Sequence, residues 1–157
     1  MYKRHKISVF LLAAVVLGIS FFVPLHYSQI SEAAITIISI TLAVYISVAT
    51  SLLGSAFSKS LKKLPDKEDP QKSMLGVLSS YLKWAGLYSI LTIIISSLYI
   101  IWPRFTLTNT NIQVAYTFAS RAFSAFSCSM FSVNIAFMSI IMKFLVVSLN
   151  NAAVMSD

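Results

Sequence analysis

The sequence predicts an all-α membrane protein in which four transmembrane helices leave both termini in the cytoplasm. Three observations support this prediction. Hydrophobic residues make up 57% of the 157 residues and charged residues only 11%, against about 25% charged residues in an ordinary soluble domain. The apolar residues form long blocks, which are typical of helices that cross a bilayer. Lysine and arginine gather between alternate blocks, as the positive-inside rule predicts for cytoplasmic segments.

The first apolar block, at residues 7–24, follows the basic start Lys3-Arg4-His5-Lys6. A basic start before an apolar run also fits a signal peptide. However, no small-residue cleavage pattern comes straight after the block. At about 1.5 Å per residue, the block also approaches the thickness of a bilayer core, about 30 Å. We therefore expect a retained first transmembrane helix.

The second block, at residues 33–57, ends in the basic cluster Lys59, Lys62 and Lys63. The next stretch, residues 64–72, combines prolines with acidic residues, and this composition predicts an exposed loop. Residues 73–83 carry apolar side chains at helical spacing, which predicts an interfacial lead-in to the third span. We therefore expect a cytoplasmic loop at residues 58–83, with the three lysines as candidates for docking to a partner.

The third block, at residues 84–102, has tryptophan at both ends, which suits the headgroup regions of a bilayer. The fourth block, at residues 114–149, is too long for one crossing. Arg121 and Lys143 bound its uncharged part, so we expect the span at residues 120–143, in a helix that extends beyond the bilayer at both ends. Together the spans predict a single helical bundle.

Orientation follows from the distribution of lysine and arginine. Two of the twelve, Arg104 and Arg121, fall in the loops that we expect outside the cell. Positive residues resist translocation and stay in the cytoplasm. We therefore expect an inner (plasma) membrane protein with both termini cytoplasmic. The net charge of +7 is explained by this orientation, so we expect no nucleic-acid partner. The cytoplasmic side holds the other ten basic residues: Lys3, Arg4, Lys6, Lys59, Lys62, Lys63, Lys67, Lys72, Lys83 and Lys143.

Small residues recur every four positions on the second and fourth spans. Residues four apart share a helix face, so each series forms a ridge along which two helices can approach closely. Asn134, deep in the fourth span, is a further candidate, either for an interhelical hydrogen bond or for a ring of asparagines in an oligomeric pore. The pattern leaves helix packing and pore lining both open. The ridge candidates are Ser47, Ser51, Ser55, Ser124, Cys128 and Ser132.

The sequence lacks motifs that carry chemistry. Its two histidines lie on opposite sides of the predicted bilayer, its single cysteine excludes an intrachain disulfide, and its serines lack the histidine and acid pattern typical of hydrolases. The spans also lack the deep ionisable residues that are typical of proton-coupled transporters. We therefore expect no enzymatic activity, no catalytic residue, no cofactor and no metal site.

The segment Leu52–Leu64 resembles the end of the second helix in RexB-type prophage exclusion proteins, which are short, four-span inner-membrane proteins with a basic central loop. The shared pattern is a Leu-Gly-Ser exit followed by spaced basic residues. The resemblance implies a prophage-encoded protein for superinfection exclusion, which permeabilises the membrane or blocks an incoming phage genome.

The leading hypothesis is a small, non-enzymatic bacterial or prophage membrane protein of the exclusion or immunity type. It would act by helix-mediated oligomerisation or by docking to a membrane partner. A second hypothesis is an ion channel formed by several copies, and a third is an accessory subunit of a larger membrane complex. The expected partners are the lipid bilayer and either further copies of the chain or another membrane protein.

Overall fold

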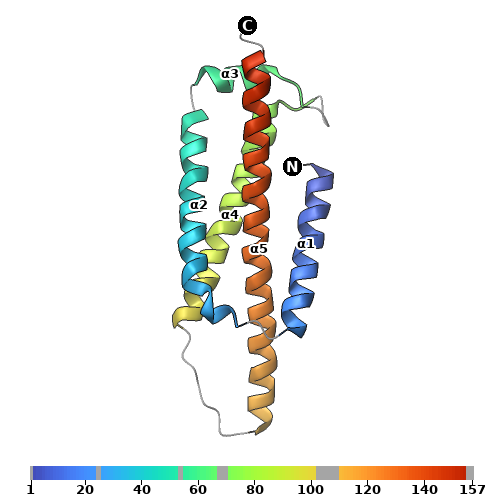
Figure 1. Cartoon of the computed structure of the whole chain (residues 1–157), viewed down its shortest axis with the longest axis vertical. Coiled ribbons are helices and arrows are strands. Elements are labelled where there is room, and N and C mark those ends of the chain that lie inside the picture. The colour runs from blue at the N-terminus through green and yellow to red at the C-terminus, as the bar shows by residue number, and fades with distance from the viewer. Residues whose placement is uncertain (1, 24–25, 53–54, 67–70, 102–109, 155–157) are drawn as a thin grey trace.

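The computed structural model describes residues 2–23, 26–52, 55–66, 71–101 and 110–154, and these residues are almost entirely helical (Figure 1). The predicted all-α class is therefore confirmed for the described part of the chain. Within it, α1, α2, α4 and α5 are long and apolar enough to cross a membrane. The elements are α1 (Lys3–Phe22), the 3₁₀ turn η1 (Tyr27–Gln29), α2 (Ser31–Leu52), α3 (Ala56–Lys63), α4 (Met74–Ile101) and α5 (Thr110–Val154).

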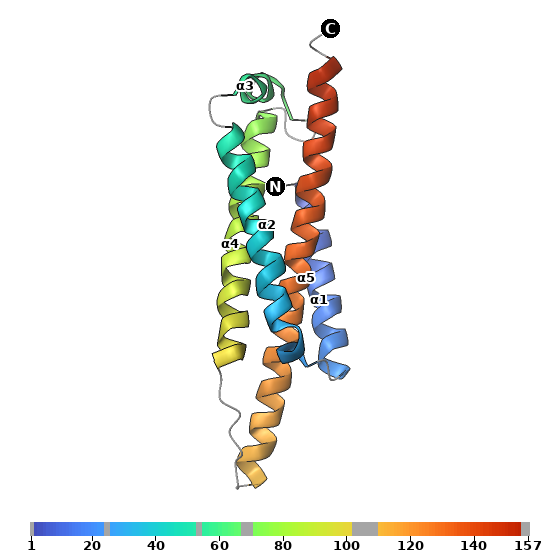
Figure 2. The same cartoon turned by 60° about the vertical axis from the view of Figure 1, so that its left-hand side comes forward.

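The long helices form an open row. Helix α2 packs on α4, α4 on α5, and α5 on α1 (Figures 1 and 2). The short helix α3 contacts α4 and α5 where the long helices end on one side of the molecule. This end of the helix axes is called the α3 end below. The turn η1 lies among α2, α4 and α5 at the opposite end, called the η1 end. The start of α1 and the end of α5 both lie toward the α3 end (Figure 1).

The largest buried cluster joins α2, α4 and α5 and includes Tyr45, Tyr81 and Phe137. Many other large apolar side chains point outward, and Phe10 and Phe22 of α1 are 77% and 85% exposed. Soluble monomers rarely expose large contiguous apolar surfaces, because water solvates them poorly. The same surface suits helices whose outer faces meet hydrocarbon.

Local sequence explains where several helices begin and end. Val23 ends α1 in an extended conformation (ψ 119°), as expected of a residue that precedes proline. Ser55 caps the N-terminus of α3, because its Oγ accepts a hydrogen bond of 3.1 Å from the backbone N–H of Ser58. Ser73 starts α4 in the same way, with 3.2 Å from its Oγ to the backbone N of Gly76. A side-chain acceptor of this kind satisfies an otherwise unpaired N–H of the first helical turn.

Helical structure extends into both ends of the predicted loop at residues 58–83. Helix α3 occupies part of it, and α4 already begins at Met74, well before the predicted residue 84. Helix α3 is stabilised by burial of Leu61, which is 0% exposed, while Lys59 and Lys62 face outward. In the α3–α4 connection, the backbone N of Asp66 lies 2.8 Å from the carbonyl oxygen of Lys72.

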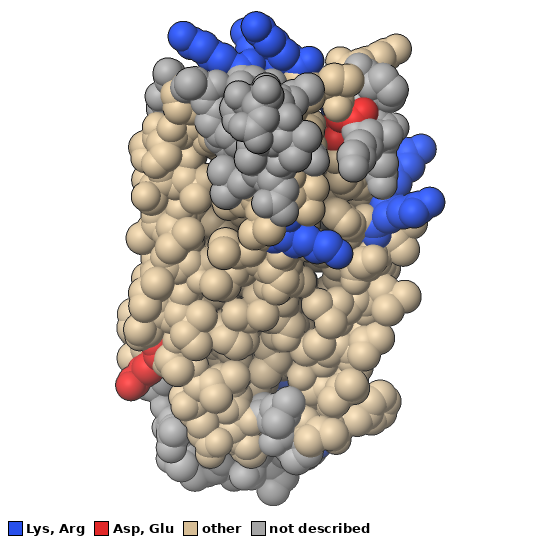
Figure 3. Space-filling model, turned by 45° about the horizontal axis from the view of Figure 1, so that its top comes forward, with Lys and Arg blue, Asp and Glu red and all other residues tan. Residues whose placement is uncertain are grey.

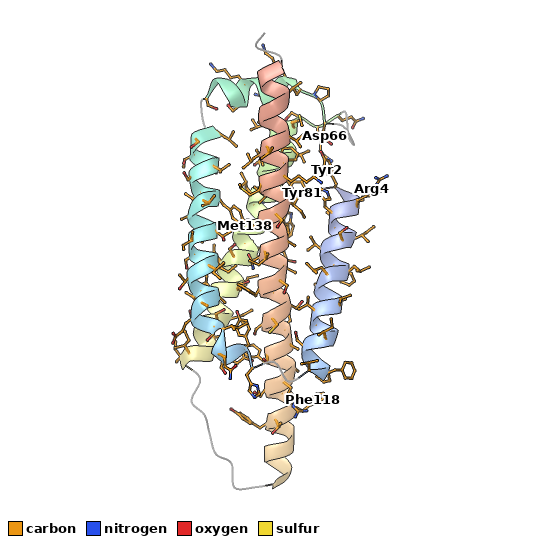
Figure 4. The ribbon with its side chains drawn as sticks, viewed as in Figure 1. Tyr2, Arg4, Asp66, Tyr81, Phe118 and Met138 are labelled. Carbon is orange, nitrogen blue, oxygen red and sulfur yellow. The ribbon has the colours of Figure 1, made fainter. Side chains whose placement is uncertain are left out.

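The prediction of an exposed loop is wrong at Asp66, which is only 2% exposed. The hydroxyl of Tyr2 donates a hydrogen bond to Asp66 Oδ1, and this polar partner explains why the carboxyl group is buried (Figure 4). The other two acidic residues of this stretch, Glu68 and Asp69, lie outside the described residues.

The last helix is much longer than a bilayer crossing. Helix α5 has 45 residues, so at about 1.5 Å per residue it is about 68 Å long. It continues past Arg121 on one side and past Lys143 on the other. Helices α1 and α2 begin and end a few residues before the predicted spans at residues 7–24 and 33–57.

Candidate functional site

A buried polar contact joins α4 to α5 near the middle of both helices, between the α3 end and the η1 end. Asn134 is 0% exposed, and its Oδ1 accepts a hydrogen bond of 2.8 Å from the hydroxyl of Ser89. Its amide nitrogen lies 2.6 Å from Thr92 Oγ1 and 3.0 Å from the carbonyl oxygen of Met130. Both polar atoms of the amide thus have partners within the chain. This geometry fixes the register of α4 against α5.

The candidates on α5 face the interior to different degrees. Ser124 and Cys128 are buried, and Ser132 is half-buried. The hydroxyl of Ser132 donates to the backbone carbonyl of Cys128 at 3.0 Å. Serine hydroxyls within helices commonly find their hydrogen-bond partner in the carbonyl four residues earlier. Ser129, one position along, donates to the carbonyl of Ala13 on α1 at 2.9 Å. The small residues of α5 therefore lie where α1 and α4 approach it.

The candidates on α2 face the other way. Ser47 and Ser51 are exposed, whereas the buried face of α2 carries Ala34, Ile38 and Tyr45. The serine ridge thus points away from the row. Ser55 lies beyond the end of α2, and its hydroxyl serves as the cap of α3.

Tyr27 lies buried at the η1 end, and no pattern in the sequence singled it out. Its side chain is 0% exposed and its hydroxyl lies 2.7 Å from Ser96 Oγ on α4. Its backbone N–H donates to Ser124 Oγ on α5 at 3.0 Å. Burial raises the pKa of the Tyr27 phenol above its ordinary value, and the hydrogen bond to Ser96 offsets part of that rise. The phenol is therefore neutral and bonds η1 to α4, while the backbone N–H of the same residue bonds η1 to α5.

A second polar cluster, which no sequence pattern indicated, joins the start of α1 to the α3 end. Tyr81 Oη on α4 accepts a hydrogen bond of 3.1 Å from the backbone N–H of Tyr2. The same oxygen lies 2.6 Å from His5 Nδ1. Together with the Tyr2–Asp66 contact, these bonds link α1, α4 and the α3–α4 connection (Figure 4). Tyr2 and Tyr81 are far apart in the sequence, so no local pattern indicated their contact.

The docking candidates Lys59, Lys62 and Lys63 are all exposed on α3. In Figure 3, lysine and arginine side chains gather around the α3 end, while uncharged residues cover most of the flank below it. The structure therefore concentrates positive charge on the end where the predicted cytoplasmic loop lies.

A polar cavity of about 270 Å³ opens at the η1 end. Its lining includes His26 and Arg121 and several hydroxyl groups, among them those of Tyr116 and Thr117. None of the described residues that line it is an aspartate or glutamate. These residues therefore offer hydrogen-bond donors and a guanidinium group rather than a carboxylate for acid–base work.

The described residues contain no group of three histidine, cysteine, aspartate or glutamate side chains that could hold a metal ion. The polar groups found instead join helices to one another. Among comparisons with known proteins, no protein-family model matches the chain, and neither curated proteins nor solved structures yield a match, so the resemblance to RexB-type proteins stays a prediction.

Proposed function

We propose that this chain is a non-enzymatic, multi-pass membrane protein that acts by associating with further copies of itself in the plane of the bilayer. The observation that carries the proposal is the outward serine ridge of α2, formed by Ser39, Ala43, Ser47 and Ser51, all of which are exposed.

Small residues gain no packing advantage by facing lipid, because lipid tails pack equally well against leucine or phenylalanine. Between helices, small residues let the backbones approach closely and add dispersion and hydrogen bonding. The outward face of α1 carries Phe10, Leu11 and Phe22. Helix α2 also exposes Ile40 and Val44, but it adds a series of four small residues at four-residue spacing, and this series favours α2 as the face that a second copy covers.

A two-fold dimer suits this ridge, because one surface patch then meets the same patch on its partner. The members of the ridge are four residues apart, so the ridge runs along the helix and is complementary to its own copy. The hydroxyls of Ser47 and Ser51 would then bond across the contact.

We further infer an inner-membrane location with both termini in the cytoplasm. The exposed lysines of α3 and the basic residues at the start of α1 support this orientation, because they gather at one end of the row (Figure 3). The resemblance over Leu52–Leu64 favours a role in exclusion or immunity within this class.

The association is tested by cysteine cross-linking in intact membranes. The background is Cys128→Ala, which removes the buried native thiol. We expect Ser47→Cys to form a disulfide-linked dimer on mild oxidation. The matched control is Leu11→Cys, which lies mid-helix on α1 and is 61% exposed. Equal cross-linking of the two variants would contradict the proposal, and a mixed disulfide to a different protein would favour an accessory subunit.

The second candidate function, an oligomeric ion-conducting pore, is favoured by hydroxyls on the same face of α2. Thr36 and Thr50 are exposed there beside the serine ridge, so several copies around an axis would line it with hydroxyl groups. Asn134 does not suit that lining, because α4 and α5 enclose it. A current in planar bilayers that falls with Ser47→Leu would support this pore, whereas no current from a purified oligomer would exclude it.

A further inference from the structure

A groove of about 700 Å³ runs between α2 and α4 beneath α3. Leu42, Ile46 and Ala49 form its wall on α2, and Leu75 and Leu82 contribute to the wall on α4. This volume lies within the range of small-molecule sites, about 300–1,000 Å³. The groove faces outward from the row, so an occupant could enter from the surrounding bilayer.

Two glycines on α4 leave room for the groove. At Gly86, a methyl group would meet only Leu42 Cδ1, at 3.9 Å. At Gly76, it would meet only Ser73 Oγ, at 3.5 Å. Both glycines line the groove, and both sit inside a helix, where glycine costs stability relative to alanine. A larger residue at either position would reduce the space.

The polar groups of the groove favour an anion. Lys62 of α3 and Lys83 of α4 both line it, together with the hydroxyls of Ser73 and Ser79. Among the described residues that line it, none is an aspartate or glutamate. The two lysines lie on the outer surface, where long side chains keep their ammonium groups at the headgroup level while their stems cover apolar surface.

Tyr45 closes the inner side of the groove. It lines the groove and is only 4% exposed, and it belongs to the buried cluster that includes Val77, Tyr81 and Phe137. Its hydroxyl is enclosed by the protein, so Tyr45 offers an occupant apolar surface rather than a hydrogen bond.

We propose that this groove binds one anionic phospholipid from the leaflet at the α3 end. An acyl chain lies along Leu42, Ile46 and Ala49, and the phosphate pairs with Lys62 and Lys83. Basic pockets between membrane helices recognise acidic headgroups in this way. The inference requires the helices to lie in lipid, but it does not depend on self-association through α2.

The experiment is native mass spectrometry of the full chain released from nanodiscs. One set of nanodiscs contains equal amounts of palmitoyl-oleoyl phosphatidylglycerol and palmitoyl-oleoyl phosphatidylcholine, and the other contains phosphatidylcholine alone. We expect the wild-type chain to retain one phosphatidylglycerol in preference to phosphatidylcholine. Each groove lysine contributes about a five-fold preference, so Lys62→Gln with Lys83→Gln lowers the preference by about 25-fold.

The matched control for charge is Lys59→Gln with Lys63→Gln, because both lysines are exposed on α3 but neither lines the groove. Gly86→Leu fills the groove and should abolish retention of either lipid. Ala49→Leu fills it from the opposite wall and serves if Gly86→Leu fails to fold. Gly18→Leu, with nothing within 4 Å of its added carbon, is the control for size.

The site is supported if the preference for phosphatidylglycerol falls more in Lys62→Gln with Lys83→Gln than in Lys59→Gln with Lys63→Gln. Support also requires that Gly86→Leu or Ala49→Leu abolishes retention of lipid. Equal retention of the two lipids by the wild-type chain would overturn it. So would equal effects of the two lysine pairs, or displacement of the preference by inorganic phosphate at millimolar concentration, which would indicate a site for a free anion.

Discussion

The hydroxyl of Ser89 on α4 lies 2.8 Å from Oδ1 of Asn134 on α5, and neither side chain is exposed. The bond joins two helices that are separated by the long connection after α4. Because the amide nitrogen of Asn134 is also bonded, to Thr92 and Met130, the contact sets both the distance and the register between the helices.

Replacing Asn134 with leucine should therefore lower stability. Leucine is similar in volume but removes the bonds to Ser89 and Thr92, and hydrogen bonds between membrane helices contribute about 0.6 kcal/mol on average and up to about 1.7. We expect the free energy of unfolding in bicelles, measured by steric trapping, to fall by about 1 kcal/mol. Ser139→Ala is the control, because its exposed hydroxyl bonds only the carbonyl of Ile135. Unchanged stability with an altered membrane conductance would instead support a pore role for Asn134.

The tie made by Tyr27 predicts a coupling between the first connection and α4. Tyr27→Phe and Ser96→Ala should each lower the free energy of unfolding by about 1 kcal/mol. The double variant should lose less than the sum of the two, since both remove the same bond. Ser28→Ala is the control at an exposed neighbouring position. Strictly additive losses would show that the 2.7 Å contact between Tyr27 and Ser96 does not contribute.

The cluster around Tyr81 predicts that the N-terminal segment loosens without it. In Tyr81→Phe, the backbone N–H of Tyr2 and the ring of His5 both lose the phenol oxygen. Amide hydrogen exchange at residues 2–6 should then accelerate, by about five-fold for a bond worth about 1 kcal/mol. Tyr88→Phe, lower on the same helix, should leave exchange at these residues unchanged. Equal exchange in both variants would contradict a role for Tyr81 in holding the segment.

The outward ridge of α2 predicts that substitutions on it weaken association between copies without lowering the stability of a single chain. Ala43→Leu with Ser47→Leu adds bulk to an exposed face, so the fold of one chain should keep its thermal stability while the oligomer dissociates in nanodiscs. Mass photometry measures the oligomer, and Leu11→Ala on α1 is the control for an exposed apolar change. Loss of thermal stability without loss of the oligomer would place the association elsewhere.

The sequence was sufficient to predict the apolar helices, because runs of this length have few alternatives in lipid. It also singled out Asn134 as an amide that needs a partner inside such a run, and in the structure Ser89 bonds it. It could not predict the direction in which each small-residue ridge faces. The series with Ser47 and the series with Ser124 have the same spacing, yet the first is exposed and the second is buried. Helical spacing defines a face but carries no information about which neighbour covers it.

The contacts of Tyr27 and Asp66 were missed for a related reason. Each lies in a short polar segment whose composition predicts a solvated loop. Their partners are far away in sequence: Tyr27 bonds Ser96 and Ser124, and Asp66 bonds Tyr2. Local composition could not reveal these pairs, because the burial of each residue depends on how distant helices come together.

The order of packing along the row has a consequence for biosynthesis. Helix α1 packs chiefly on α5 and α2 on α4, so α1 meets its principal neighbour only after α2 and α4 have been made. During insertion into a bilayer as proposed, α1 would lie beside lipid or the insertion machinery until then. A chain that stops before residue 110 should therefore retain the α2–α4 pair but leave α1 without its principal neighbour, as a target for membrane proteases.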